Sequence, residues 1–394
     1  MHLSNSMRCL VASLALSGFA NAQSAELLSG ALKDYADLSL FRSLLSAFPK
    51  SLQSVVANKN TNITVLVPTN NAFTTYLSNS GISDVTKLGS EEIQTFFSYH
   101  ILSASLKSSD FDDDRGMAIP TLLQEEKYNN RTAGPELMRE FGNGATGQIL
   151  FASSSNSSSR MRRQSTSPTV MLRAGLGQDA LMRAVDGAWG PNKVNSFQII
   201  DSVLIPPKPC SVTIRSSKDI LSGLDAALNK TGLYPTLDTT PNVTCLAPST
   251  SAFREAGNPQ EALSKIDLTG ALLHHTLKEV TYTNYLEDGM VLGTFNNTKV
   301  RVRIMDDDIY FNNAKVIEAN VLTNNGLIHI LDAVIKPDSN APSSTSTAST
   351  STASNGAPSS TSSSRASPSQ SSAANVISVG FPGLVALVAG LAIA

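Results

Sequence analysis

Apolar residues recur at spacings of three and four in several stretches of the chain, a pattern typical of amphipathic helices with one buried face. The members of three such stretches are Leu38, Phe41, Leu44, Leu45 and Phe48; Ile93, Phe96, Phe97, His100 and Ile101; and Ile220, Leu221, Leu224, Ala227 and Leu228. The second pattern places His100 on the buried stripe of its helix. His275 holds the equivalent position behind Leu268, Ala271 and Leu272.

Other stretches have the pattern of β-strands. Residues 64–67 form a short apolar, β-branched run, and Pro68 with the following asparagines supplies a turn that ends it. Residues 300–305 alternate between apolar and polar side chains, which predicts a half-buried strand. Residues 197–205 and 327–335 are the most apolar runs, each followed by a proline, and are expected to be central strands. Helices followed by strands predict an α+β fold.

The chain contains the same arrangement twice. Residues 62–73 match residues 242–253 position for position, and residues 198–206 match residues 329–337. Matching helical stretches that end at His100 and His275 lie between these blocks. Three blocks in the same order indicate a tandem repeat of whole domains, because solenoid repeats recur every 20–50 residues. The expected domains are 23–208 and 209–338, with an insertion at about 103–169 in copy one.

Both ends of the chain resemble targeting segments. Residues 1–22 combine one basic residue, an apolar run and a small-residue site, which predicts a cleaved signal peptide. Residues 375–394 are almost wholly apolar and uncharged, which predicts a GPI-anchor signal, the alternative being a short transmembrane tail. Residues 339–374 are rich in Ser, Thr, Ala and Pro and are expected to be a disordered, O-glycosylated stalk, the alternative being a linker without glycans. This order predicts a protein displayed on the outer leaflet of the plasma membrane, with transfer to the cell wall as a further possibility.

Composition agrees with an extracellular location. The net charge of −2 and the 16% of charged residues provide no basic field for nucleic acid. Once Cys9 has left with the signal peptide, Cys210 and Cys245 remain as an even pair in an oxidising compartment. One disulfide is expected, and two buried free thiols are the alternative.

Two kinds of modification site are expected. Six Asn-x-Ser/Thr sequons predict glycosylated surface positions: Asn62, Asn130, Asn156, Asn229, Asn242 and Asn296. A basic cluster that ends at Arg163 lies in a Ser-rich stretch of the insertion, which suggests cleavage by a processing protease after Arg163, with an intact basic loop as the alternative.

The repeated blocks resemble the signature of the fasciclin domain. The resemblance rests on the strand and turn at 65–73, on Tyr99-His100 after an aromatic helix, and on residues 325–335, and it covers nearly all of 25–337 in two copies. It implies a β-wedge or sandwich with packed helices, and a role in adhesion to matrix or cell-wall protein or polysaccharide. In some animal members the Tyr-His block is linked to integrin binding.

The resemblance also identifies residues that belong either to a ligand surface or to the core: Tyr99, His100, His274, His275, Asp201 and Asp332. Two departures stand out. Copy one has Asn195-Ser196-Phe197-Gln198 where Asn-Gly-x-x-His is usual, and copy two has His274-His275 for Tyr-His.

Enzyme motifs are poorly represented. No Gly-x-Ser-x-Gly elbow is present, and the Asp-rich runs lack the calcium-loop pattern. No cofactor, metal or catalytic residue is therefore expected. The alternative function is a surface hydrolase or carbohydrate-modifying enzyme that uses His275 with a nearby carboxylate such as Asp332.

Overall fold

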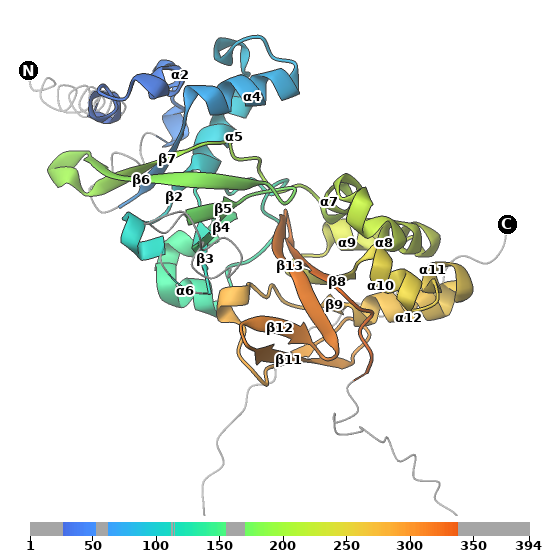
Figure 1. The fold of residues 1–394 in the computed structure, drawn as a ribbon. Coiled ribbons are helices and arrows are strands. Elements are labelled where there is room, and N and C mark those ends of the chain that lie inside the picture. The colour runs from blue at the N-terminus through green and yellow to red at the C-terminus, as the bar shows by residue number, and fades with distance from the viewer. Residues whose placement is uncertain (1–26, 53–61, 112, 114, 155–169, 338–394) are drawn as a thin grey trace, which may run out of the picture. The chain divides into compact units, whose positions relative to one another are not determined.

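The computed structural model describes residues 27–52, 62–111, 113, 115–154 and 170–337 (Figure 1). The elements of copy one are η1 Ala36–Leu38, α2 Ser39–Leu44, η2 Leu45–Ala47, β1 Thr64–Pro68, α4 Asn70–Ser80, η3 Val85–Lys87, α5 Ser90–His100, β2 Ile101–Leu102, η4 Ser108–Phe111, β3 Met117–Pro120, α6 Pro135–Phe141, η5 Gly142–Thr146, β4 Ile149–Ser154, β5 Val170–Arg173, β6 Asp179–Trp189, η7 Pro191–Lys193 and β7 Asn195–Ile200. Those of copy two are α7 Cys210–Ser216, α8 Lys218–Thr231, α9 Tyr234–Thr239, β8 Val243–Pro248, α10 Thr250–Glu255, α11 Pro259–Ala262, α12 Lys265–His274, β9 Thr276–Leu277, η8 Thr283–Tyr285, β10 Val291–Gly293, β11 Lys299–Met305, β12 Asp308–Phe311, β13 Ala314–Thr323 and β14 Gly326–Leu331.

The two copies have the same sheet topology. The order is β2-β1-β7-β6-β5-β4-β3 in copy one and β9-β8-β14-β13-β12-β11-β10 in copy two. In each sheet one parallel pair, β1 with β7 or β8 with β14, lies among antiparallel neighbours. The predicted α+β class and the central position of β7 and β14 are confirmed.

Each sheet bends until its two edge strands nearly meet. Leu102, at the end of β2, forms an antiparallel bridge with Thr121, just after β3. Leu277 and Thr294 form the corresponding bridge in copy two. A nearly closed sheet leaves few unpaired edge groups, and with its packed helices it confirms the fold that the resemblance implied.

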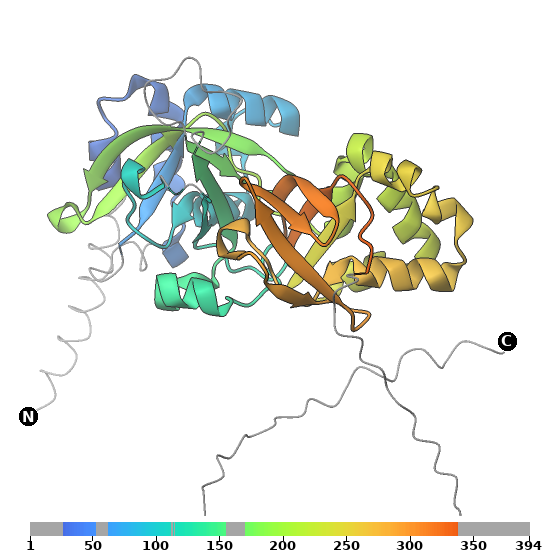
Figure 2. The ribbon, with the colours of Figure 1, turned by 60° about the horizontal axis from the view of Figure 1, so that its bottom comes forward.

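The helices of each copy cover its sheet, and Figures 1 and 2 show α7 to α12 together on one side of copy two. The predicted apolar faces of α5 and α8 are buried except at two positions, Ile93, which is half-buried, and Ile220. Ile220 was expected on the buried face of α8, but 41% of it is exposed. Leu221 has φ −118° and ψ 17°, which interrupts the helix and turns Ile220 away from the core.

The largest group of extra residues in copy one lies between β3 and β4. Residues 121–148 fill this connection, whereas residues 294–298 are enough between β10 and β11. The longer connection contains α6 and η5. The predicted insertion at about 103–169 also contains β3 and β4, which have the counterparts β10 and β11 in copy two. Its residues 155–169, with Asn156 and Arg163, lie outside the described residues.

In the described part of the chain, no helix is long and apolar enough to cross a membrane. The predicted signal peptide, stalk and hydrophobic tail all lie outside it.

Candidate functional site

His100 and His275 each link the end of a helix to the segment that follows a central strand, β7 or β14. His100 is fully buried, donates from Nδ1 to the Phe96 carbonyl at 2.8 Å, and accepts at Nε2 from the Leu204 N–H at 3.0 Å. His275 makes the same pair of bonds, to the Ala271 carbonyl at 2.8 Å and from the Ile335 N–H at 2.9 Å. Both rings are therefore neutral structural groups of the core.

Burial lowers the pKa of these histidines. The pKa of His100 falls to about 3, and that of His275 to about 4, because the charged imidazolium would lose its hydration. Nδ1 bonds to backbone carbonyls oppose this shift without reversing it.

Tyr99 is also a core residue. It has no exposed surface, its hydroxyl donates to the Ile149 carbonyl at 3.1 Å, and burial raises its pKa. Of the two possibilities for the Tyr-His block, ligand surface or core, the structure selects the core. Integrin-type recognition through this pair would require the domain to open.

Asp201 and Asp332 terminate the central strands. The Asp201 carboxylate accepts from the Leu181 N–H at 2.8 Å, and the Asp332 carboxylate accepts from the Lys315 N–H at 2.8 Å. Each carboxylate thus bonds to the neighbouring strand. β7 and β14 end directly before these aspartates, earlier than the prolines at which the strands were expected to end.

Gln198 explains one departure from the usual motif. It pairs with Leu66 in the sheet, as His329 pairs with Leu246, so the two hold equivalent positions. The Gln198 Oε1 accepts from Val185 and Asp186 at the irregular register of β6, and the His329 Nδ1 accepts from Asn320 in β13. Gln198 and His329 thus accept hydrogen bonds from equivalent β-bulges in the two copies.

His274 differs from its neighbour. Its Nδ1 lies 2.5 Å from the Thr298 hydroxyl, and its Nε2 has no partner among the described residues. No group of three or more potential metal ligands occurs in that same set of residues.

The catalytic pair of the alternative enzyme hypothesis is not formed. Both nitrogens of His275 bond to backbone groups, and the Asp332 carboxylate bonds to the Lys315 N–H. A general base needs a free ring nitrogen within reach of the proton that it takes. The hypothesis that His275 and Asp332 act together is therefore wrong in this geometry.

Cys210 and Cys245 are both buried in the core of copy two and are present as free thiols rather than as the expected disulfide. A hydrogen bond to Cys245, together with burial, favours the protonated Cys210 thiol and raises its pKa. Their placement corresponds to the alternative of two buried thiols.

The sequons are not equally exposed. Asn62 and Asn229 are exposed, whereas Asn130, Asn242 and Asn296 are half-buried. The Asn242 Oδ1 accepts from the Thr132 N–H at 2.8 Å, and the Asn130 Nδ2 donates to the Thr239 carbonyl at 3.2 Å. Two sequons therefore meet where copy one contacts copy two.

Both copies belong to one compact unit, and polar contacts join them. Gly175 forms a parallel β-bridge with Leu322, and Lys208 forms one with Thr323. The Arg173 guanidinium donates to the Ala319 carbonyl at 2.7 Å. A shared apolar cluster adds to these contacts: Ala118, Leu137, Ala145, Ile149 and Phe151 of copy one with Tyr282, Leu322 and Leu327 of copy two.

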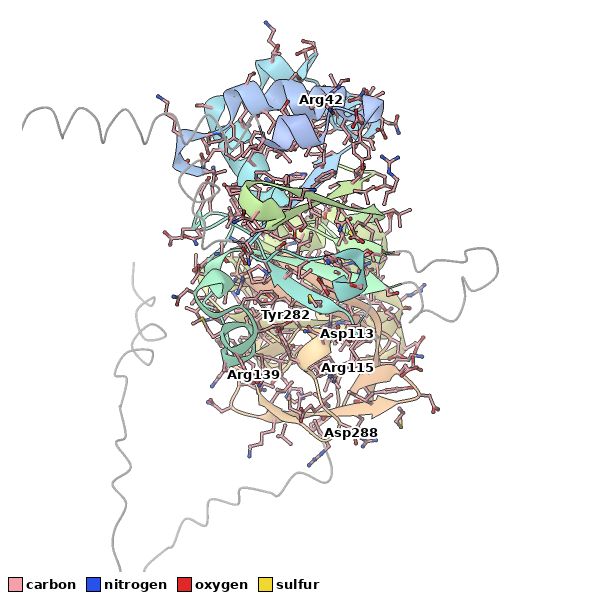
Figure 3. The ribbon with its side chains drawn as sticks, turned by 90° about the vertical axis from the view of Figure 1, so that its left-hand side faces the viewer. Arg42, Asp113, Arg115, Arg139, Tyr282 and Asp288 are labelled. Atoms are coloured by element: carbon pink, nitrogen blue, oxygen red, sulfur yellow. The ribbon has the colours of Figure 1, made fainter. Side chains whose placement is uncertain are left out.

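A cleft of about 700 Å³ opens at this junction. The inserted segment, with α6, forms one wall, and residues 278–292 of copy two form the other. Figure 3 shows Tyr282, Asp113, Arg115 and Arg139 in this part of the molecule, with Arg42 distant from it. The volume lies within the range of small-ligand sites.

Three polar atoms of the cleft residues are buried without a hydrogen-bond partner among the described residues: Arg131 Nη1, the Tyr282 hydroxyl and Asn284 Oδ1. An unpaired buried polar group costs about 1–3 kcal/mol, so such a cluster marks a site that a further molecule can complete.

Sequence reasoning missed all three residues. Arg131 was recognised only as the middle of a sequon, and Tyr282 and Asn284 belong to no motif. The available signal was the length of the 121–148 connection, which supplies one wall of the cleft.

Comparisons with known proteins agree with the fold. A family model described as the fasciclin domain matches residues 36–142 and 220–337. The chain is 23% identical over 313 residues to a fasciclin-like arabinogalactan protein of Arthroderma benhamiae, covering 78% of this chain and 66% of that protein. It is 24% identical over 324 residues to the fasciclin-like arabinogalactan protein elcF of Phaeosphaeria nodorum, covering 80% and 90%.

An animal protein and a solved structure are also similar. Human periostin is 26% identical over 147 residues, which is 36% of this chain and 17% of periostin. A solved FAS1 domain pair from the insect cell adhesion molecule fasciclin I is 16% identical, with a TM-score of 0.33, covering 77% of this chain and 98% of that one.

Proposed function

Because this chain belongs to the fasciclin domain family, we propose that it is an extracellular adhesion protein that binds a matrix or cell-wall component through its junction cleft. Its fungal relatives carry the name arabinogalactan protein, and the family resemblance implies adhesion. Beyond adhesion itself, the proposal specifies that the junction cleft is the part of the surface that binds the matrix or cell-wall component.

One observation carries the choice of the cleft. Tyr99, His100, His275, Asp201 and Asp332 all bond to backbone groups of the same copy and maintain its fold. The unpaired polar atoms lie in the cleft instead. Since function depends on groups that remain available to a ligand, the cleft is the better candidate than the motif.

We expect a bulky side chain at Gly134 to abolish binding to wall or matrix components. Gly134 lines the cleft and is exposed, and no heavy atom lies within 4 Å of the position that a Cβ would take there. Gly134→Trp therefore fills the cleft without a clash at the Cβ. Retention of the full chain on a glycan and matrix-protein array should fall at least about tenfold, a loss of roughly 1.4 kcal/mol.

Gly30→Trp is the matched control. Gly30 is exposed and equally uncrowded, but it does not line the cleft. Equal retention of both variants and the unmodified chain would exclude the cleft as the adhesive surface. If the unmodified chain is retained by nothing on the array, the adhesion proposal itself is overturned.

The proposed location is the outer leaflet, through a GPI anchor added near the stalk. The apolar, uncharged residues 375–394 support this proposal, with the small and polar residues before them. Phosphatidylinositol-specific phospholipase C should release the protein from intact cells, and a Triton-soluble protein that resists the enzyme would indicate a transmembrane tail.

A further inference from the structure

We propose that the junction cleft is a binding site for acidic sugars, with a hexuronate carboxylate between Arg131 and Tyr282 and a sugar hydroxyl at Asn284. The inference rests on the proposed function and names the ligand class for the same cleft. It depends on which donors and acceptors of the cleft residues have no hydrogen-bond partner among the described residues.

Arg131 supplies a buried positive charge. Only 8% of it is exposed, its Nε donates to Gln148 Oε1 at 3.4 Å, and its Nη2 donates to the Gly147 carbonyl. Its Nη1 has no partner, and no carboxylate forms an ion pair with it, within the described residues. A buried guanidinium without a counter-charge favours binding of an anion, and its planar donors match a carboxylate.

Tyr282 supplies a second donor beside this charge. It is 2% exposed, and its hydroxyl is unpaired in the described structure. Tyr282 and Arg131 line the same cleft. Burial raises the pKa of Tyr282, and the Arg131 charge opposes that shift. The phenol therefore stays protonated and donates to an acceptor at the same place.

Asn284 distinguishes a sugar acid from a simple anion. Its Oδ1 is an acceptor without a partner among the described residues, so it requires a donor. Sulfate, which has no hydrogen to donate, would satisfy the two donors and leave this acceptor unfilled. A carboxylate that carries hydroxyl groups on neighbouring carbons satisfies all three atoms.

The cleft walls suit a saccharide. The half-buried ring of Tyr285 lines the cleft and packs edge to face on the ring of Tyr282, with the ring centroids 6.4 Å apart at 80°. Five carboxylates line the cleft: Asp113, Glu136, Glu140, Glu279 and Glu287. Glu136 pairs with Arg139, Glu140 accepts from the Tyr285 hydroxyl at 2.7 Å, and Asp113 accepts from the Arg115 N–H at 2.8 Å, and none of the five forms an ion pair with Arg131 among the described residues. They do not neutralise Arg131.

The test measures the affinity of the full chain for trigalacturonate by isothermal titration calorimetry, with fully methyl-esterified trigalacturonate as the uncharged comparison. The unmodified chain should bind the acid, and it should bind the ester at least about tenfold more weakly. Tyr282→Phe removes only the unpaired hydroxyl, so it should weaken binding about tenfold, and because a buried unpaired hydroxyl is destabilising it should raise the Tm rather than lower it.

Tyr234→Phe is the matched control with the opposite expected result. The Tyr234 hydroxyl donates to Asp225 at 2.6 Å and does not line the cleft, so its loss should lower the Tm and leave affinity unchanged. No binding of trigalacturonate, or equal binding by the Tyr282 variant, would overturn the inference. So would a fall in Tm for Tyr282→Phe as large as that for Tyr234→Phe.

Two further results separate the ligand class from the adhesion function. An oligo-glutamate peptide that binds in place of trigalacturonate, and that loses affinity in Tyr282→Phe, would overturn the sugar class. Retention on other array components that Gly134→Trp prevents, without trigalacturonate binding, would likewise overturn the sugar class and support adhesion.

Discussion

Acidification from pH 7 to pH 4.5 should lower the free energy of unfolding by roughly 6–8 kcal/mol through three histidines alone. His100, His275 and His329 are buried and neutral, and burial lowers their pKa values to about 3, 4 and 4. In the unfolded chain each histidine takes up a proton near pH 6.5. Each therefore stabilises the fold fully above pH 6.5, and this contribution is lost as the pH falls towards the folded pKa, at about 1.4 kcal/mol per pH unit.

The effect should be larger in copy two, which contains His275 and His329, than in copy one, which contains His100. Urea titrations at intervals between pH 7 and pH 4.5, followed by circular dichroism, measure it directly. Protonation of carboxylates changes stability mainly at the acid end of this window, so the slope between pH 6.5 and pH 5.5 reports the histidines.

A natural substitution provides the control. Gln198 occupies in copy one the position of His329 in copy two, and both accept from the backbone of a β-bulge. His329→Gln should therefore be tolerated at pH 7. It should reduce the slope of the unfolding free energy against pH by the contribution of one proton, about 1.4 kcal/mol per pH unit. A slope that is the same in both proteins, or a flat profile in the unmodified chain, would show that these histidines are protonated in the folded state.

Replacement of His275 by alanine should destabilise copy two by about 3–5 kcal/mol at pH 7. The imidazole is 5% exposed, and its removal leaves a cavity. It also leaves the Ile335 N–H, which now donates to Nε2 at 2.9 Å, without an acceptor in the core. The cavity and the unpaired N–H both lower the free energy of unfolding. Thermal or urea unfolding of the full chain measures their combined effect.

The adjacent His274 is the matched control. It is 8% exposed and bonds through Nδ1 to Thr298 near the surface, so His274→Ala should cost about 1 kcal/mol. If His275→Ala folds as stably as the unmodified chain, the assignment of His275 to the scaffold is wrong. In that case a chemical role for its ring would need to be considered again.

Local sequence patterns were sufficient for the secondary structure and for the duplication. The spacing of apolar residues identified α5 and placed His100 on its buried stripe, and the apolar runs at 197–205 and 327–335 identified β7 and β14. These predictions succeed because the periods of helices and strands are set by the backbone, which is the same wherever an element lies. Ile220 departs from the prediction because the next residue, Leu221, interrupts α8 with a backbone irregularity that no periodicity predicts.

The roles of the motif residues needed the tertiary structure. Tyr99 and His100 could have belonged to a ligand surface or to the core, because sequence alone does not show what packs against the end of α5. The partners are the Ile149 carbonyl and the Leu204 N–H, which lie 50 and 104 positions away along the chain.

By itself, the sequence determined that two homologous α+β domains follow one another, with polar and apolar terminal segments typical of a surface protein. Only the tertiary structure showed that copy one contacts copy two through its inserted segment, and that Arg131 and Tyr282 lie together in one cleft. The physical reason is that periodicity reports on contacts within an element, whereas a binding site is formed by contacts between distant elements. The packing of the two domains brings those distant elements together.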